Sequence, residues 1–104
     1  MSLKNFRSFH LSVEFHKECE RAKIPGYLRN QVLRASSSIC LNLGEGDSKP
    51  SVRDRLKYFH IALGSCRECQ AAFALLPQVD PKLDELLDRL GASLYRLIYP
   101  KPGA

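Results

Sequence analysis

The segment from Gln31 to Gly46 places a row of polar residues inside an otherwise apolar stretch. These polar residues recur every three or four positions, so on an α-helix they share one face: Gln31, Arg34, Ser38, Asn42 and Glu45. Apolar residues fill the flanks, with Leu28, Val32, Ala35, Ile39 and Leu43 on one side and Leu33, Cys40 and Leu41 on another. A helix that is apolar on most sides is buried, and polar side chains within it lower stability unless they are hydrogen-bonded. The sequence therefore predicts a buried helix whose polar row bonds to another helix, another subunit or a ligand.

Two helices are expected in the first half of the chain. The first runs from about Phe9 to Lys23, with Ser8 as its N-cap, and a proline–glycine pair then interrupts the pattern. The second runs from about Tyr27 to Leu43. It is expected to end near Gly44 or Gly46, because glycine readily takes the left-handed conformation that closes many helices.

Two more helices are expected in the second half. Ser51 is a good N-cap for the third, Ser51 and Asp54 resemble a capping box, and the helix runs to about Leu76. Asp80-Pro81 is a strong helix start, since a capping acid precedes a proline at the first helical position. The fourth helix continues through a series of leucines and stops before Pro100.

Short connections between long helices favour antiparallel neighbours. The chain shows no strand-like alternation and no internal repeat. We therefore expect an all-α fold, an up-down antiparallel four-helix bundle that forms a single domain over residues 1–104. A core of this size is modest, so association with further copies would add stability.

The net charge of +5 is unevenly placed along the chain. Residues 1–67 hold twelve of the sixteen Lys and Arg against six acids, whereas residues 68–104 hold four against five. This asymmetry suggests an anionic partner for the basic part. No apolar run approaches the roughly 20 residues that span a bilayer, and the first ten residues lack the apolar core of a secretory signal. A cytoplasmic location is the expectation.

The third helix carries a row of basic side chains that could meet phosphates. Arg53, Lys57, His60 and Arg67 share one face, and the row spans about 21 Å at 1.5 Å per residue. Other candidate binding residues lie near its start and around the first loop: Lys49, Arg55, Lys17, Arg21, Lys23 and Arg29. Because no aromatic residues alternate with them on that face, base stacking is not predicted. Binding would be led by phosphate contacts and would be salt-sensitive; the alternative is an ordinary solvated helix face.

Catalytic, metal and redox chemistry find little support. Cys66 and Cys69 form a CxxC in the middle of a helix, where such pairs are not activated, and His10 and His16 lack ligand spacing. The serines at 36–38 have no nucleophile elbow, and the GEG at 44–46 follows a helix, whereas a phosphate loop precedes one. We expect no enzyme, no metal and no cofactor. A thiol or metal protein that uses Cys66 and Cys69 is the alternative.

Two spaced motifs resemble a known family. The second-helix pattern Q-x-x-R-A-x-x-S-I-x-x-N-I-A-E-G is met by Gln31, Arg34, Ala35, Ser38, Ile39, Asn42, Glu45 and Gly46, with Leu43 in place of Ile and Gly44 in place of Ala. The third-helix pattern I-A-x-G-S-x-x-E is met by Ile61, Ala62, Gly64, Ser65 and Glu68. The chain thus resembles the four-helix bundle proteins encoded in intervening sequences of bacterial 23S ribosomal RNA genes.

This resemblance implies function as well as fold. Members of the family are similar to the accessory variability protein of diversity-generating retroelements, a basic pentameric barrel that assists a reverse transcriptase and binds nucleic acid. The resemblance implies a non-enzymatic ring, a homopentamer, that binds RNA or DNA, and RNA is favoured. The alternative is a protein–protein adaptor for a reverse transcriptase. Exposed apolar residues would support assembly, and the candidates are Leu33, Leu41, Tyr58 and Phe73.

The matched polar residues are expected to form a buried structural network. Arg34 on the second helix would pair with Glu68 on the third, since buried charges are tolerated only when they are paired. Gln31, Ser38, Asn42 and Ser65 would bond to one another or to the backbone, and Gly64 would let a neighbouring backbone approach closely. The alternative is a row that faces a ligand, in which Arg34, Asn42 and Glu45 line a groove.

Overall fold

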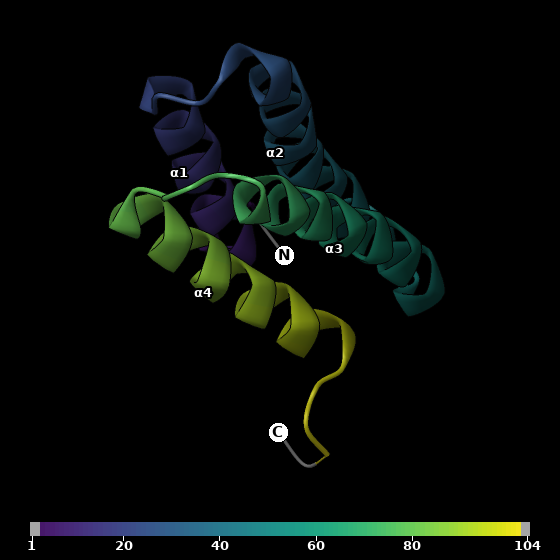
Figure 1. Cartoon of the computed structure of the whole chain (residues 1–104). Helices are drawn as coiled ribbons and strands as arrows, with labels where there is room; N and C mark the ends of the chain where they lie inside the picture. The colour runs from purple at the N-terminus through teal and green to yellow at the C-terminus, as the bar shows by residue number, and fades with distance from the viewer. Residues whose placement is uncertain (1–2, 103–104) are drawn as a thin grey trace.

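The computed structural model describes residues 3–102, and over that range the chain contains helices and no strand. The elements in order are the 3-10 helix η1 (Leu3–Asn5) and the α-helices α1 (Arg7–Arg21), α2 (Gly26–Asp47), α3 (Val52–Ala74) and α4 (Pro81–Ile98) (Figure 1). The predicted all-α four-helix class is confirmed.

The four α-helices pack in a closed cycle. Each helix contacts the next one along the chain, α1 also contacts α4, and the contact between α2 and α3 is the most extensive (Figure 1). This arrangement is compatible with the up-down antiparallel order expected from the short connections. In this order the start of one helix lies beside the end of its neighbour, and the start of α1 lies near the end of α4.

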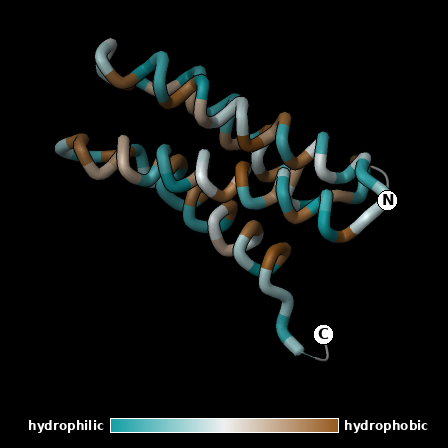
Figure 2. Tube along the Cα trace, turned by 90° about the vertical axis from the view of Figure 1, so that its right-hand side faces the viewer, coloured by the Kyte–Doolittle hydropathy of each residue, from teal (hydrophilic) through white to brown (hydrophobic). Residues whose placement is uncertain are grey.

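A single apolar core runs between the helices. Its fully buried side chains come from all four of them and include Phe15 and Cys19, Ile39 and Leu43, Ala62 and Cys66, and Leu90 and Leu94. Hydrophobic and hydrophilic stretches alternate along the helices (Figure 2). The flank of α2 that was predicted to be buried is buried at all of its positions: Leu28, Val32, Ala35, Ile39 and Leu43. No helix within residues 3–102 has the length and apolar character that crossing a membrane requires.

The start of α1 differs from the prediction. The helix begins at Arg7, its N-cap is Phe6, and no side chain caps it. Ser8 lies inside the helix, buried, with its hydroxyl hydrogen-bonded to that of Ser93 on α4. Phe6 is also buried and packs edge-on against Phe59 of α3, with ring centroids 5.9 Å apart. The predicted Ser8 cap is wrong because this long-range contact draws the chain into the bundle before Ser8.

The end of α2 also differs from the prediction. The helix continues through Gly44 and Gly46 to Asp47, and its C-cap Ser48 is in the right-handed region. Gly46 is buried, and a Cβ added there would lie 2.6 Å from Cε1 of Phe59. Gly46 thus serves the close approach of α2 to the start of α3, and no left-handed turn depends on it.

Local signals at the next two helix starts are confirmed. Ser51 Oγ accepts a hydrogen bond from the backbone N–H of Asp54, and the Asp80 carboxylate accepts one from the N–H of Lys82. Both bonds satisfy backbone donors that an uncapped helix leaves unpaired. At its other end α3 stops at Ala74, two residues before the predicted end at Leu76.

Candidate nucleic-acid interface

The polar row of α2 meets α3 as predicted. The Arg34 guanidinium donates from Nη2 to Oε2 of Glu68 at 2.9 Å, and the Ser65 hydroxyl donates to Ser38 Oγ at 2.9 Å. Asn42 Nδ2 donates to the backbone carbonyl of Ser38, also at 2.9 Å. The Arg34–Glu68 and Ser65–Ser38 bonds join the two motifs whose residues resemble the family pattern, and the Asn42–Ser38 bond lies within the first motif.

The expectation that this network is buried is wrong. The side chains of Arg34 and Glu68 are 62% and 49% exposed, and Gln31 and Glu45 are exposed as well. Only Ser65 is buried, with Ser38 and Asn42 half-buried. The neighbouring apolar stripe of α2 faces the core, so the polar row lies at the outer edge of the contact with α3.

Gly64 does not have the predicted role. It lies on the exposed side of α3, and a Cβ added there would meet no atom within 4 Å. Within the described chain, no backbone uses this glycine for close approach.

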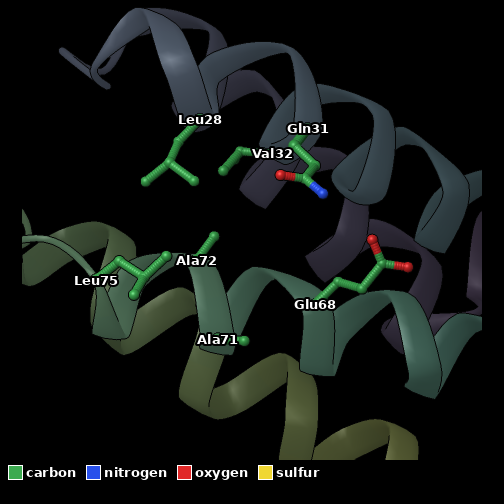
Figure 3. Close-up of a pocket in the computed structure, with 7 residues that line it drawn as sticks. All are labelled: Leu28, Gln31, Val32, Glu68, Ala71, Ala72 and Leu75. Carbon is green, nitrogen blue, oxygen red and sulfur yellow. The ribbon is translucent and has the colours of Figure 1, made fainter.

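A shallow groove of about 330 Å³ lies between α2 and α3 (Figure 3). Gln31 and Glu68 extend into the space between the two helices, and Leu28 and Leu75 lie at its apolar end. Of the residues in the alternative ligand-facing row, Arg34, Asn42 and Glu45 are not among those that line this groove. The groove is mostly apolar, so it suits a protein surface better than a phosphate.

The basic residues around the first loop are largely engaged in local structure. Arg21 donates to the Glu18 carboxylate at 2.7 Å, and Lys82 from α4 lies 3.3 Å from the same carboxylate. Arg29 donates to the backbone carbonyls of Ala22 and Glu20 at the end of α1. Within this part of the predicted binding surface, Arg21 and Arg29 are engaged in local contacts, whereas Lys17 and Lys23 face solvent.

The basic row of α3 is exposed as predicted. Arg53, Lys57, His60 and Arg67 all lie on the solvent side of the helix. Beside it, the ammonium groups of Lys49 and Lys57 lie 5.3 Å and 5.8 Å from the centroid of the Tyr58 ring, and Arg55 Nε donates to the Lys49 carbonyl at 2.7 Å. These contacts hold three cations near the start of α3.

The fold collects the net charge at one end of the bundle. Contacts such as those of Ser8 with Ser93 and of Phe6 with Phe59 bring together the first half of α1, the second half of α2, the first half of α3 and the second half of α4. Residues 3–13, 37–62 and 90–102 make up this half, which we call the basic end. It holds eight Lys and Arg against three Asp and Glu, a difference of five, whereas residues 14–36 and 63–89 hold eight of each.

The basic end contains cations that the sequence analysis did not assign. Lys4 and Arg7 come from the start of the chain, and Arg96 and Lys101 come from its end. They join Lys49, Arg53, Arg55 and Lys57 only because the helices alternate in direction. These cations would have been found by adding the charges of the helix ends that an up-down bundle places together, instead of adding the charges along the chain.

The four cysteines are free thiols in a nonreactive setting. Cys19, Cys66 and Cys69 are buried, and Cys40 is half-buried. Burial raises the pKa of Cys66 to about 11 and that of Cys19 to about 12, and it also raises the pKa values of Cys40 and Cys69. A thiol that keeps its proton is a poor nucleophile and a poor metal ligand. No cluster of three or more His, Cys, Asp or Glu suited to a metal occurs within residues 3–102.

One arrangement has the outline of a catalytic triad. His16 Nδ1 lies 2.6 Å from Ser36 Oγ, and His16 Nε2 lies 3.8 Å from a carboxylate oxygen of Glu20. Ser36, however, is 0% exposed, and its hydroxyl donates to the Leu33 carbonyl at 3.2 Å. A hydroxyl without access to solvent cannot attack a substrate, so this group acts as a polar bridge between α1 and α2.

Comparison with known proteins gives one family. The family model of the 23S rRNA-intervening sequence protein matches residues 6–96. No curated protein and no solved structure matches the chain at a significant level. The match covers nearly all of α1 to α4, including both motifs joined by the Arg34–Glu68 and Ser38–Ser65 contacts. The chain therefore belongs to the family of 23S rRNA-intervening sequence proteins.

Proposed function

We propose that this chain is a non-enzymatic, cytoplasmic protein that binds RNA through phosphate contacts at its basic end. The observation that carries the proposal is the concentration of the whole net charge in one half of the bundle. Clustered Lys and Arg release counterions from a nucleic-acid backbone, which drives binding with little sequence information. The description of the family, which connects it with intervening sequences of 23S rRNA, favours RNA over DNA.

Two matched double variants test this proposal. Arg53→Gln with Lys57→Gln removes one arginine and one lysine from the basic end. Lys23→Gln with Arg67→Gln removes one arginine and one lysine from the other half, residues 14–36 and 63–89, which we call the neutral half. All four side chains are exposed, so both variants are expected to fold.

Fluorescence anisotropy with a labelled RNA at several salt concentrations gives the affinity and its salt dependence. For the basic-end variant we expect weaker binding and a plot of log K against log salt that is shallower by about 1.4 for a single strand, since each lost phosphate contact removes about 0.7. The neutral-half variant should keep the wild-type slope. Equal losses in both variants, or a wild-type affinity that salt does not change, would contradict the proposal.

We also propose that the chain assembles into a ring, with the pentamer of the family resemblance as the expected number. Of the apolar residues predicted to support assembly, Phe73 is buried in the core, so the prediction is wrong for that residue. Leu33 and Tyr58 are half-buried and offer little apolar surface to another copy. Leu41, however, is 72% exposed.

Two separate apolar areas support a ring. One is the groove between α2 and α3 with exposed Leu75, and the other is a depression between α1 and α2 lined by Val13, Cys40 and Leu41. A ring needs two different surfaces that fit each other, whereas a two-fold dimer uses one surface twice.

Single charges placed in each area separate these possibilities. Leu75→Lys and Leu41→Lys should each reduce the native mass, measured by mass spectrometry or light scattering, to that of a monomer. An equimolar mixture of the two variants should form a dimer and nothing larger, because only one good pair of surfaces remains. A mixture that stays monomeric, or single variants that keep the wild-type mass, would refute the two-surface ring.

The alternative proposal is an adaptor whose partner is a protein such as a reverse transcriptase. A reverse-transcriptase gene or a template repeat beside the gene for this chain would favour it. A location inside an rRNA gene would oppose it.

A further inference from the structure

Three aromatic rings from two helices gather on the surface of the basic end. Tyr95 on α4 and Tyr99, the C-cap residue of that helix, are 54% and 51% exposed, and their ring centroids lie 4.8 Å apart. The exposed His60 ring on α3 lies 6.0 Å from that of Tyr99. We call His60, Tyr95 and Tyr99 the aromatic cluster.

The aromatic cluster contributes little to the fold. The core between α3 and α4 is formed by other side chains, such as Cys66 and Leu94, which are fully buried. Tyrosines that serve packing are normally buried with a bonded hydroxyl. Within residues 3–102 no side-chain hydrogen bond of His60, Tyr95 or Tyr99 occurs. Rings that are half exposed and unbonded leave π-faces open to a ligand.

Several cations lie close to this cluster along α3 and at the end of α4. Lys57 lies one turn before His60 on the exposed face of α3, Arg53 lies one turn earlier, and Arg96 and Lys101 flank the tyrosines. The nearest carboxylate along the same face of α4 is Asp88, seven residues before Tyr95 or about 10 Å along the helix axis. The aromatic rings therefore lie on the positive side of the α3–α4 surface.

We propose that the aromatic cluster is a stacking platform for unpaired bases, so that the ligand of the basic end is single-stranded nucleic acid. Aromatic side chains beside a positively charged surface form the usual binding site for single strands, because every base has a π-face while the phosphates meet the cations. A duplex keeps its bases stacked on each other and can use only the cations. The sequence gives no aromatic alternation on α3 alone; the rings that stand beside its basic row come from α4. This inference rests on the proposed function.

The test compares two ligands and three variants. The ligands are a single-stranded 12-mer of adenosine nucleotides and a 12-base-pair RNA duplex. The variants are Tyr95→Ala with Tyr99→Ala, the conservative pair Tyr95→Phe with Tyr99→Phe, and the charge variant Arg53→Gln with Lys57→Gln. Each is measured by anisotropy over a salt series, and a strand that carries 2-aminopurine reports stacking by its change in fluorescence.

We expect the alanine pair to weaken binding of the single strand about tenfold or more, with an unchanged salt slope and loss of the 2-aminopurine signal. Its duplex binding should match wild type, and the phenylalanine pair should bind both ligands normally. The charge variant should weaken both ligands and flatten both slopes.

Other results overturn the inference in distinguishable ways. Equal losses for single strand and duplex, or no loss in the alanine pair, mean that the rings do not stack on bases, while the proposed function stands. Binding of neither ligand by the wild type removes the proposed function as well. A reduced native mass of the alanine pair means that a second copy of the chain covers the rings.

Discussion

The guanidinium of Arg34 on α2 bonds to the carboxylate of Glu68 on α3 at 2.9 Å, although both side chains are about half exposed or more. Water competes for both groups and salt screens them, so such pairs contribute about 0–1 kcal/mol. Stronger destabilisation would require a buried, unpaired carboxylate.

Arg34→Ala should therefore lower the free energy of unfolding by less than about 1 kcal/mol, as measured by urea titration. The loss should become smaller in 0.5 M salt. A loss of several kcal/mol would show that another copy or a ligand encloses this pair.

The two motif glycines on α2 and α3 are expected to respond in opposite directions. Gly46→Ala would place a methyl group 2.6 Å from the Phe59 ring, so it should destabilise the fold by about 1–3 kcal/mol. Gly64→Ala enters open space on a helix and should stabilise it by about 0.5–1 kcal/mol. Thermal melts of both variants check this pair, and equal effects would contradict it.

The two motif isoleucines test the core with one chemical change. Ile39 is 0% exposed, and Ile39→Ala should cost about 2–5 kcal/mol through lost burial and a cavity. Ile61 is 44% exposed, and Ile61→Ala should cost less than about 1 kcal/mol. Chemical denaturation measures both, and a large loss at Ile61 would point to a contact outside the single chain.

Buried thiols should make stability fall in alkaline solution. Burial raises the pKa of Cys66 from 9.0 to about 11, so between these values the unfolded chain loses the proton while the folded chain keeps it. The unfolded state then binds fewer protons, and the free energy of unfolding decreases with pH by up to about 1.4 kcal/mol per unit for each such thiol.

Urea titrations at pH 8, 9, 10 and 11 should show this decline, and Cys66→Ala should make it less steep than in the wild type. The two proteins differ only at this side chain, so the comparison isolates the thiol. Identical slopes would mean that Cys66 ionises in the folded state.

Local signals explain why much of the fold could be predicted. The caps at Ser51 and Asp80 depend on neighbours two or three residues away, so the sequence displays them directly. The buried side of α2 follows from helical spacing alone. The start of α1 could not be predicted in this way, because it depends on Phe6 meeting Phe59 across the bundle.

The candidate site was only partly predictable for the same reason. The exposed row on α3 follows from spacing on a single helix, and the pairing of Arg34 with Glu68 was expected from the two matched motifs; both are present. The exposure of that pair was not predictable, because spacing on α2 shows which stripe is buried but not how far the contact with α3 extends beyond it. The α3 row is joined by cations from both ends of the chain, namely Lys4, Arg7, Arg96 and Lys101. Their proximity depends on the directions of all four helices, and no local sequence pattern shows those directions.

The basic end carries the whole net charge and the opposite end carries none, so the molecule has an electric dipole moment that runs from one end of the bundle to the other. A dipole of this kind turns as it approaches a polyanion, so its productive collisions are oriented before contact. In a ring whose rotation axis follows the helices, identical subunits would also hold their positive poles side by side and repel one another. Anions or a nucleic-acid strand bound beside those positive ends would reduce the repulsion. Assembly of the ring and binding of the strand would then favour each other.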